Sequence, residues 1–216
     1  MVAKRRKVGN LMALAVLSTI IQRPMHPYEI ASVMKARGKD RDMRIKWGTL
    51  YTVVGNLEKH GFIEATENVR SGSRPERTVY RITQAGIDEL QDWTSELIGT
   101  PEPEQTSFEA GLSVLAGLHP DEVMRLLGAR LDLLTDSLAE QRAEYARVAT
   151  EIPRILLAEW DYTLALLAAE INWVRTFLDE LTSGTMPGIP QWREWHETGR
   201  LSAELAELAE RGAIKD

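Results

Sequence analysis

The sequence predicts a mainly α-helical protein with two domains, on the basis of its length, its apolar spacing and its charge distribution. The chain has 216 residues, 44% of them hydrophobic, which is enough to bury a full core in one large domain or in two small ones. Apolar residues recur at helical spacings through most of the chain, and two strand-like segments lie between residues 62 and 83. The charge balance differs between the two halves, which favours two domains.

The basic residues are concentrated in the first half of the chain. Residues 1–96 carry 16 Lys and Arg against 11 Asp and Glu, whereas residues 97–216 carry 10 against 21. All 16 of these basic residues lie within residues 1–82, which hold only 7 acidic ones. This asymmetry suggests that the front of the chain meets a polyanion. A solvated basic face is the alternative, and charge alone leaves both interpretations open.

The first predicted helix covers residues 11–22 and is apolar on nearly every side. A helix without a polar face is normally buried on two sides, so we expect Leu14 and Leu17 to reach a subunit interface. The alternative is a secretory leader, because a basic start precedes this apolar run. Against a leader, Ser18 and Thr19 interrupt the run, it is shorter than the ~20 residues that span a bilayer, and no small-residue cleavage pattern follows.

Two further helices precede the strand-like segments. Residues 28–37 and residues 49–59 each repeat apolar side chains on one face, and Gly61 offers a left-handed stop after the second of them. The other face of the helix at residues 49–59 carries polar side chains that nothing in the chain obviously covers. We therefore expect these polar side chains to contact a partner.

A basic hairpin is predicted directly after this helix. Residues 62–69 and 78–83 alternate as strands do, and the segment RSGSRPER between them offers a glycine and a proline for the turn and three arginines. Helix, strand, basic hairpin and strand form the order of a winged helix-turn-helix. In that fold the polar helix enters a DNA groove and the hairpin, or wing, lies against the adjacent backbone.

The remaining boundaries follow from a cap and a linker. Thr83 is expected to cap a fourth helix that runs to about Ile98. The segment GTPEPEQT has two prolines and acidic side chains, as linkers do. The predicted organisation is a winged helix-turn-helix domain over residues 1–98, a linker over 99–106, and an all-α dimerisation domain with a C-terminal tail over 107–216.

The second domain carries a coiled-coil pattern. Apolar residues within 157–181 alternate at spacings of three and four, which is the 3.5-residue period of a coiled coil. A preceding helix over 123–148 can fold back to cover part of this seam, but a second stripe of Leu166, Trp173 and Phe177 remains. We infer that a second subunit covers it. The predicted interface residues in this half are Leu164, Leu167, Ile171, Trp173, Val174 and Leu178.

The tail combines a loop-like segment with a short helical pattern. Residues 183–199 contain two prolines and the closely spaced Trp192 and Trp195, which are expected to clasp the helical domain because tryptophan is rarely left in water. Residues 200–211 resume a helical spacing.

Four segments, PMHPYEI, GTLYTVVGNLEKHGFIE, TVYRITQAGIDEL and AEINWVRTFLDEL, together resemble the PadR family of bacterial transcription regulators. With the helical half they cover most of residues 10–182, and the length resembles the subfamily with a large C-terminal dimerisation domain. The resemblance implies a homodimeric repressor that binds double-stranded operator DNA and leaves it when a small, often aromatic, effector or another signal arrives. It aligns Tyr51 with a tyrosine of the family that often contacts a DNA phosphate. This chain departs from the family at Gly55 and Asn56, where basic residues are common.

The pattern and the resemblance together give a set of DNA-contacting candidates. The predicted residues are Lys46, Thr49, Tyr51, Thr52, Asn56 and Lys59 at the third helix and Arg70, Arg74 and Arg77 in the wing. Arginine and lysine suit phosphates, and Asn56 can pair bidentately with adenine. Lys4, Arg5, Arg6 and Lys7 form either an arm that follows DNA or a soluble end. An ordinary exposed helix face, or a winged domain that binds a protein partner instead of DNA, is the alternative.

Other chemistry finds little support in the sequence. Trp93 offers a flat face for stacking on an aromatic effector, although buried packing is the commoner use of tryptophan. The four histidines have no ligand spacing, so no metal site is expected. The sequence has no phosphate-binding glycine loop and no nucleophile elbow, so we expect neither a cofactor nor an enzyme. The lack of cysteine suits a cytoplasmic protein that does not associate with membranes.

Overall fold

The computed structural model describes residues 6–39, 43, 45–69, 77–201, 203, 206 and 207. The chain forms two compact units, Met1–Pro103 and Glu104–Asp216, which we call the winged unit and the helical unit. The division falls inside the segment 99–106. Most of the helix predicted over residues 200–211 lies outside the described residues.

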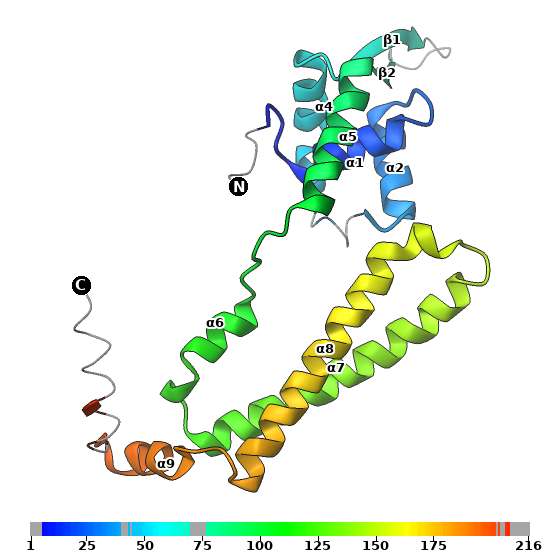
Figure 1. The fold of residues 1–216 in the computed structure, drawn as a ribbon. Helices are drawn as coiled ribbons and strands as arrows, with labels where there is room; N and C mark the ends of the chain where they lie inside the picture. The colour runs from blue at the N-terminus through cyan, green and yellow to red at the C-terminus, as the bar shows by residue number, and fades with distance from the viewer. Residues whose placement is uncertain are drawn as a thin grey trace. The chain divides into compact units, whose positions relative to one another are not determined.

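The winged unit contains four α-helices, one 3-10 turn and two strands among its described residues. In chain order they are α1 (Leu11–Ile20), α2 (Pro27–Ala36), η1 (Trp47–Thr49), α4 (Leu50–Lys59), β1 (Ile63–Val69), β2 (Arg77–Ile82) and α5 (Gln84–Gly99) (Figure 1). The strands pair antiparallel, with Ile63 opposite Ile82. Met25 extends the sheet edge through two backbone hydrogen bonds with Tyr80, each 3.0 Å long. This architecture confirms the predicted winged helix-turn-helix.

The apolar helix α1 is enclosed within the winged unit, because α2, α4, α5 and β2 all pack against it. Asn10 caps its start by accepting a hydrogen bond from the Met12 N–H at 2.9 Å. Leu14 and Leu17 are buried in this core. The prediction that they reach a subunit interface is therefore wrong, since four elements of the same unit supply the cover that the sequence pattern requires.

Three residues fix the path from α4 to α5. Gly61 has a φ of 74°, which is the left-handed conformation predicted for the stop after α4. Gly86 allows α5 to approach this turn closely, because a Cβ atom at that position would lie 2.0 Å from the carbonyl oxygen of Phe62. Thr83 caps α5, as predicted, and its hydroxyl accepts a hydrogen bond from the Gly86 N–H at 3.1 Å. The end of α4 is thus held beside the wing strands and the start of α5.

The helical unit consists of helices in the residues that the structure describes. They are α6 (Ser107–Ser113), η2 (Leu115–Gly117), α7 (Pro120–Val148), η3 (Arg154–Leu157), α8 (Ala158–Ser183) and α9 (Ile189–Thr198). None of the described helices in the chain combines the length and the apolarity that crossing a membrane requires.

The two long helices α7 and α8 form an antiparallel hairpin whose apolar seams face each other (Figure 1). Leu164 and Ile171 pack with Leu138, and Val174 packs with Val123. The 29 residues of α7 are enough to cover the 26 residues of α8 along this seam. The assignment of the seam to a second subunit therefore needs correction for residues that pack within one chain. These residues are Leu164, Ile171 and Val174, which are buried, whereas Leu167 and Leu178 are half-buried and stay predicted interface residues.

The segment that the sequence pattern presented as a loop forms the helix α9. Pro190 lies in its first turn, where the missing N–H of proline costs no hydrogen bond, and Gly188 turns the chain before it with a φ of 90°. The Trp192 indole N–H donates a hydrogen bond of 3.1 Å to the carbonyl oxygen of Ala116 in η2. Trp192 therefore clasps the helical unit, as predicted, but it does so from a helix.

Candidate nucleic-acid interface

Helix α4 has two faces of opposite character. Leu50, Val53, Val54 and Leu57 are buried in the core of the winged unit. The exposed face carries Tyr51, which is 66% exposed, together with the polar or small residues Thr52, Gly55, Asn56 and Lys59. The core therefore fixes α4 through one side, and the other side presents hydrogen-bonding groups, the carboxylate of Glu58 and the ammonium group of Lys59 to the surroundings.

The start of α4 is shaped by the short turn η1. Lys46 is exposed directly before this turn, and the Thr49 hydroxyl donates a hydrogen bond of 2.9 Å to the carbonyl oxygen of Lys46. Thr49 is half-buried and is therefore less available than Thr52 or Asn56. The hydroxyl of Thr49 therefore holds the turn in place through the backbone of Lys46, whose side chain is exposed.

Positive charges of the winged unit fall into two groups. Arg23 pairs with Glu29, and Arg81 pairs with Glu64 at 2.6 Å. In contrast, no carboxylate of the described residues lies within salt-bridge distance of Lys46 or Lys59. Among the described residues, Lys46 before η1 and Lys59 at the end of α4 therefore have no carboxylate partner, whereas those arginines are neutralised by neighbours. An uncompensated cation is free to pair with a phosphate without breaking an existing ion pair.

Arg6 belongs to the compensated group, so it does not form part of a free basic arm. Its side chain is 4% exposed and donates hydrogen bonds to Glu89 at 2.9 Å, to Asp92 at 3.0 Å and to Glu96. Burial lowers the pKa of Arg6, but the hydrogen bonds to these carboxylates outweigh it and raise the pKa above its ordinary value. Lys4 and Arg5 lie outside the described residues.

Trp93 lies beneath Arg6 in the core of the winged unit. Its side chain is 6% exposed, and the Arg6 guanidinium carbon lies 5.1 Å from the centroid of its ring. This geometry is a cation–π contact, in which the ring face is already occupied. The structure therefore uses Trp93 for packing, and an effector could stack on this face only if Arg6 moved away.

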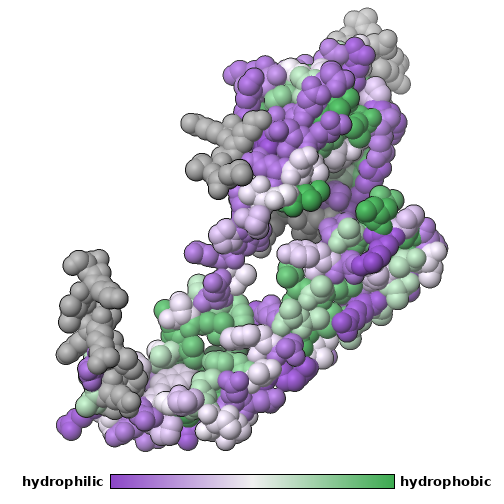
Figure 2. All heavy atoms as spheres, viewed as in Figure 1, coloured by the Kyte–Doolittle hydropathy of each residue, from purple (hydrophilic) through white to green (hydrophobic). Residues whose placement is uncertain are grey.

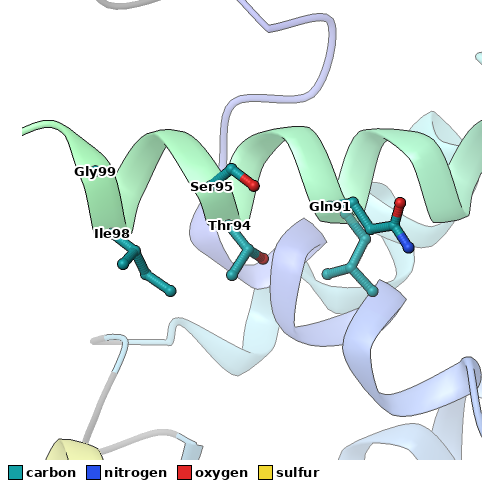
Figure 3. A pocket seen from close by; sticks show the side chains of 6 residues that line it. Gln91, Thr94, Ser95, Ile98 and Gly99 are labelled. Atoms are coloured by element: carbon teal, nitrogen blue, oxygen red, sulfur yellow. The ribbon is translucent and has the colours of Figure 1, made fainter.

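A shallow depression lies along the side of α5 from which the side chains of Gln91, Thr94 and Ile98 project (Figure 3). Its volume is about 420 Å³, and its lining residues are Leu90, Gln91, Thr94, Ser95, Ile98 and Gly99. All of them belong to one helix, so the depression is open on its other sides. Ligand pockets normally enclose most of the ligand surface, and this depression alone does not.

The wing is connected to α4 by a contact that the sequence analysis missed. The Tyr80 hydroxyl on β2 donates a hydrogen bond of 3.4 Å to the Glu58 carboxylate on α4. Burial, together with the negative charge and hydrogen bond of Glu58, raises the pKa of Tyr80 above its ordinary value of 10.0. The pair of Tyr80 and Glu58 could have been found only by knowing how β2 packs beside α4.

Of the predicted wing arginines, Arg70 and Arg74 lie outside the described residues, and Arg77 is the first residue of β2.

The helical unit keeps an apolar stripe on the outer side of α8. Leu166 is 52% exposed and Trp173 is 43% exposed, although Trp173 also stacks on Phe177 with ring centroids 5.0 Å apart. Phe108 of α6 meets Trp173 edge to face at 5.9 Å. Figure 2 shows hydrophobic residues at the surface of this unit, along α6 and the hairpin. Single exposed apolar residues are normal, but a continuous stripe of them is typical of an interface.

Two histidines that are distant in sequence meet in the helical unit. The rings of His119 and His196 are 5.8 Å apart between centroids, and His196 Nε2 lies 2.8 Å from the carbonyl oxygen of Ala116. Their spacing in the sequence gives no sign of this contact, which arises because α9 packs against α7. Within the described residues, no group of three or more His, Cys, Asp or Glu side chains could hold a metal ion.

Comparison with known proteins places the winged unit in a family. Residues 16–92 match the model of the transcriptional regulator PadR-like family. These residues run from α1 into α5 and include both α4 and the wing. Among characterised proteins, none matches the sequence closely enough to count as a relative.

Several solved structures are similar to this chain over most of its length. Bacillus subtilis PadR in complex with operator DNA is 19% identical with a TM-score of 0.65, and the match covers 79% of this chain and 99% of that one. The same regulator in complex with p-coumaric acid is 18% identical with a TM-score of 0.67, covering 80% and 99%. The Vibrio cholerae virulence activator AphA is 19% identical with a TM-score of 0.57, covering 80% and 98%.

Identities this low establish a shared fold, whereas the family match rests on the sequence of the winged unit itself. The matched residues include the buried face of α4, its exposed polar face and the strands that form the wing. The greater part of the winged unit therefore matches the PadR-like family of transcriptional regulators, and the chain shares its fold with the solved PadR structures.

Proposed function

We propose that this protein is a transcriptional repressor that binds operator DNA as a homodimer, with α4 in the major groove. The observation that carries the proposal is the exposed polar face of α4, with Lys59 at its end and Lys46 before η1, neither of which has a carboxylate partner among the described residues. A helix fits the major groove of B-DNA, and lysines flanking it are suited to the phosphates on either side.

The individual residues have different roles in this proposal. Asn56 is exposed in the second half of α4 and can pair bidentately with adenine, which would read one base. Lys46, Lys59 and Tyr51 would contact phosphates, which position the helix without selecting a sequence. Gly55 would allow the helix backbone to lie close to the duplex, because a side chain is absent at the centre of the exposed face.

A homodimer would place two such helices on one duplex. The exposed stripe of α8 that includes Leu166 and Trp173 supports a second subunit as its cover. Two recognition helices related by a two-fold axis read half-sites about 34 Å apart, or a multiple of that distance. The operator is therefore expected to be an inverted repeat.

Release by a small aromatic compound is the proposed regulation. Bacillus subtilis PadR has been crystallised with operator DNA and with p-coumaric acid, and its fold is similar to that of this chain. Because AphA shares the fold and is described as an activator, the direction of regulation needs its own measurement. A reporter gene placed behind the operator should be silenced by the protein and restored by its effector, for which p-coumaric acid is the first compound to test.

The test of DNA binding is a titration of fluorescent DNA from upstream of the gene that encodes this protein, at several salt concentrations. We expect binding that weakens steeply with salt, since each phosphate contact contributes a slope of about −0.9 to log K against log salt. Replacing both Lys46 and Lys59 with glutamine should make the slope shallower, whereas Arg175→Gln on the exposed surface of α8 should not. Binding to a protein partner without any DNA shift would favour the protein-interaction alternative.

A further inference from the structure

A lysine of α2 is held at the start of α4 by an aromatic ring. Lys35 is exposed in the last turn of α2, and its Nζ atom lies 4.8 Å from the centroid of the Trp47 ring. Trp47 is the first residue of η1, which leads directly into α4. A cation over the face of an indole ring is attracted by the ring electrons. The side chain of Lys35 therefore connects α2 to the beginning of the recognition helix.

The charge of Lys35 is uncompensated, unlike that of the neighbouring arginines. Arg23 at the start of the same helix-turn-helix region pairs with Glu29, whereas no carboxylate in the described part of the chain lies within salt-bridge distance of Lys35. Lys46, which directly precedes Trp47 in the sequence, is also exposed and has no carboxylate of the described residues within salt-bridge distance. Lys35 through its ring contact and Lys46 through its place in the sequence thus both adjoin Trp47, ahead of α4.

We propose that Lys35, held against Trp47, binds a backbone phosphate of the operator at the N-terminal end of α4. This inference rests on the proposed DNA binding and assigns a phosphate contact to α2 in addition to those of α4. A free lysine loses rotamer freedom when it binds a phosphate, and the contact with Trp47 has already removed part of that freedom in the unbound protein. Because the contact is to a phosphate, it should be independent of base sequence.

The experiment is a salt titration of DNA binding with the full-length chain and three variants. Lys35→Gln should lower affinity about fivefold per half-site at physiological salt and make the salt slope shallower by about 1 per half-site, equally for specific and random DNA. Lys35→Arg keeps the charge and the ring contact, so it should bind like the wild type. Arg175→Gln removes one positive charge from α8 and should leave both the affinity and the slope unchanged. Circular dichroism of each variant should show that the fold is retained.

Each result has a distinct meaning. If the wild type binds no DNA, the proposed function fails and this inference fails with it. If the wild type binds with a steep salt slope and Lys35→Gln matches it in affinity and slope, only the role of Lys35 is refuted. A loss of affinity confined to one operator sequence, with the slope unchanged, would show that Lys35 reads a base and would overturn the assignment to a phosphate.

Discussion

Arg6 determines how the beginning of the chain is attached to the winged unit. Its guanidinium donates to three carboxylates of α5 and covers the face of Trp93, so one side chain ties the segment before α1 to a helix more than 80 residues later. The planar fork of arginine suits several acceptors at once, which a lysine could not match. The sequence alone could not distinguish this arginine from its basic neighbours, because the three acidic partners lie far away on α5.

Replacing Arg6 with glutamine should destabilise the protein by about 2 kcal/mol, because it leaves the carboxylates of Glu89, Asp92 and Glu96 without the guanidinium. The value is below the 3 to 5 kcal/mol typical of fully buried pairs, since the three carboxylates are partly exposed. Chemical denaturation followed by near-UV circular dichroism measures the change. Arg23→Gln removes an exposed ion pair, so it should lower the free energy of unfolding much less than Arg6→Gln does. Equal losses in the two variants would contradict a special role for Arg6.

Tyr80 makes a pH-dependent contribution to stability. Its pKa is raised above 10.0 in the folded protein by burial and by Glu58. A group with a raised pKa stabilises the fold fully below the pKa of the unfolded chain and loses that contribution as pH rises through the folded pKa. The stability of the wild type should therefore fall as pH rises above about 10.

The variant Tyr80→Phe should lack this alkaline loss. At neutral pH it should cost about 1 kcal/mol or less, because a single partly exposed hydrogen bond is removed. Tyrosinate absorbance during an alkaline titration should show a late-ionising phase in the wild type that Tyr80→Phe loses. Tyr28→Phe, which removes an exposed phenol on α2, should keep the late phase. The idea fails if Tyr80→Phe and the wild type show the same late phase.

At the scale of elements, α1 and α9 show what limits a prediction from sequence. The periodicity of α1 correctly identified a helix buried all round, but the pattern contains no information about which elements cover it. For α9, two prolines suggested a loop, although both can precede or begin a helix without losing a hydrogen bond. By contrast, Gly61 and Thr83 were predicted correctly, because a left-handed stop and a cap are local properties of a few residues.

In the candidate site, too, local features could be predicted from the sequence, whereas contacts between distant elements could not. The exposed polar face of α4 follows from the spacing of Leu50, Val54 and Leu57, so it could be predicted from the sequence. The contact of Lys35 with Trp47 could not, because it joins α2 to η1 through tertiary packing. The buried position of Trp93 beneath Arg6 is likewise a property of the assembled unit.

Gly55 provides a test of how closely α4 approaches its ligand. It lies inside an exposed helix, and an added Cβ would meet nothing within 4 Å, so Gly55→Ala should raise stability by about 1 kcal/mol. If the backbone of α4 lies against the duplex, the same change should lower operator affinity several-fold. Gly128→Ala in α7 should stabilise the protein comparably without affecting DNA binding. Unchanged affinity in Gly55→Ala would show that the duplex does not need this glycine.

At the scale of the whole molecule, the proposed function assigns DNA contact to the winged unit and dimerisation to the helical unit. The winged unit carries an excess of basic residues and the exposed face of α4, whereas the acidic helical unit carries the apolar stripe of α8. A repressor dimer needs both, because a single recognition helix contacts too few phosphates and bases for high specificity. Loss of the dimer should therefore weaken operator binding even if α4 is unchanged.

A negative charge placed on the apolar stripe of α8 tests whether operator binding depends on the dimer. Leu166→Glu would bury an unpaired carboxylate in a subunit interface, so we expect the variant to be a monomer in analytical ultracentrifugation and to bind the operator much more weakly. Leu166 is half exposed in the single chain, so the helical hairpin should remain folded by circular dichroism. Asn172→Glu adds the same charge to a neighbouring exposed face and should remain a dimer. A wild type that sediments as a monomer, or a Leu166→Glu variant that still dimerises, would show that this stripe does not hold two subunits together.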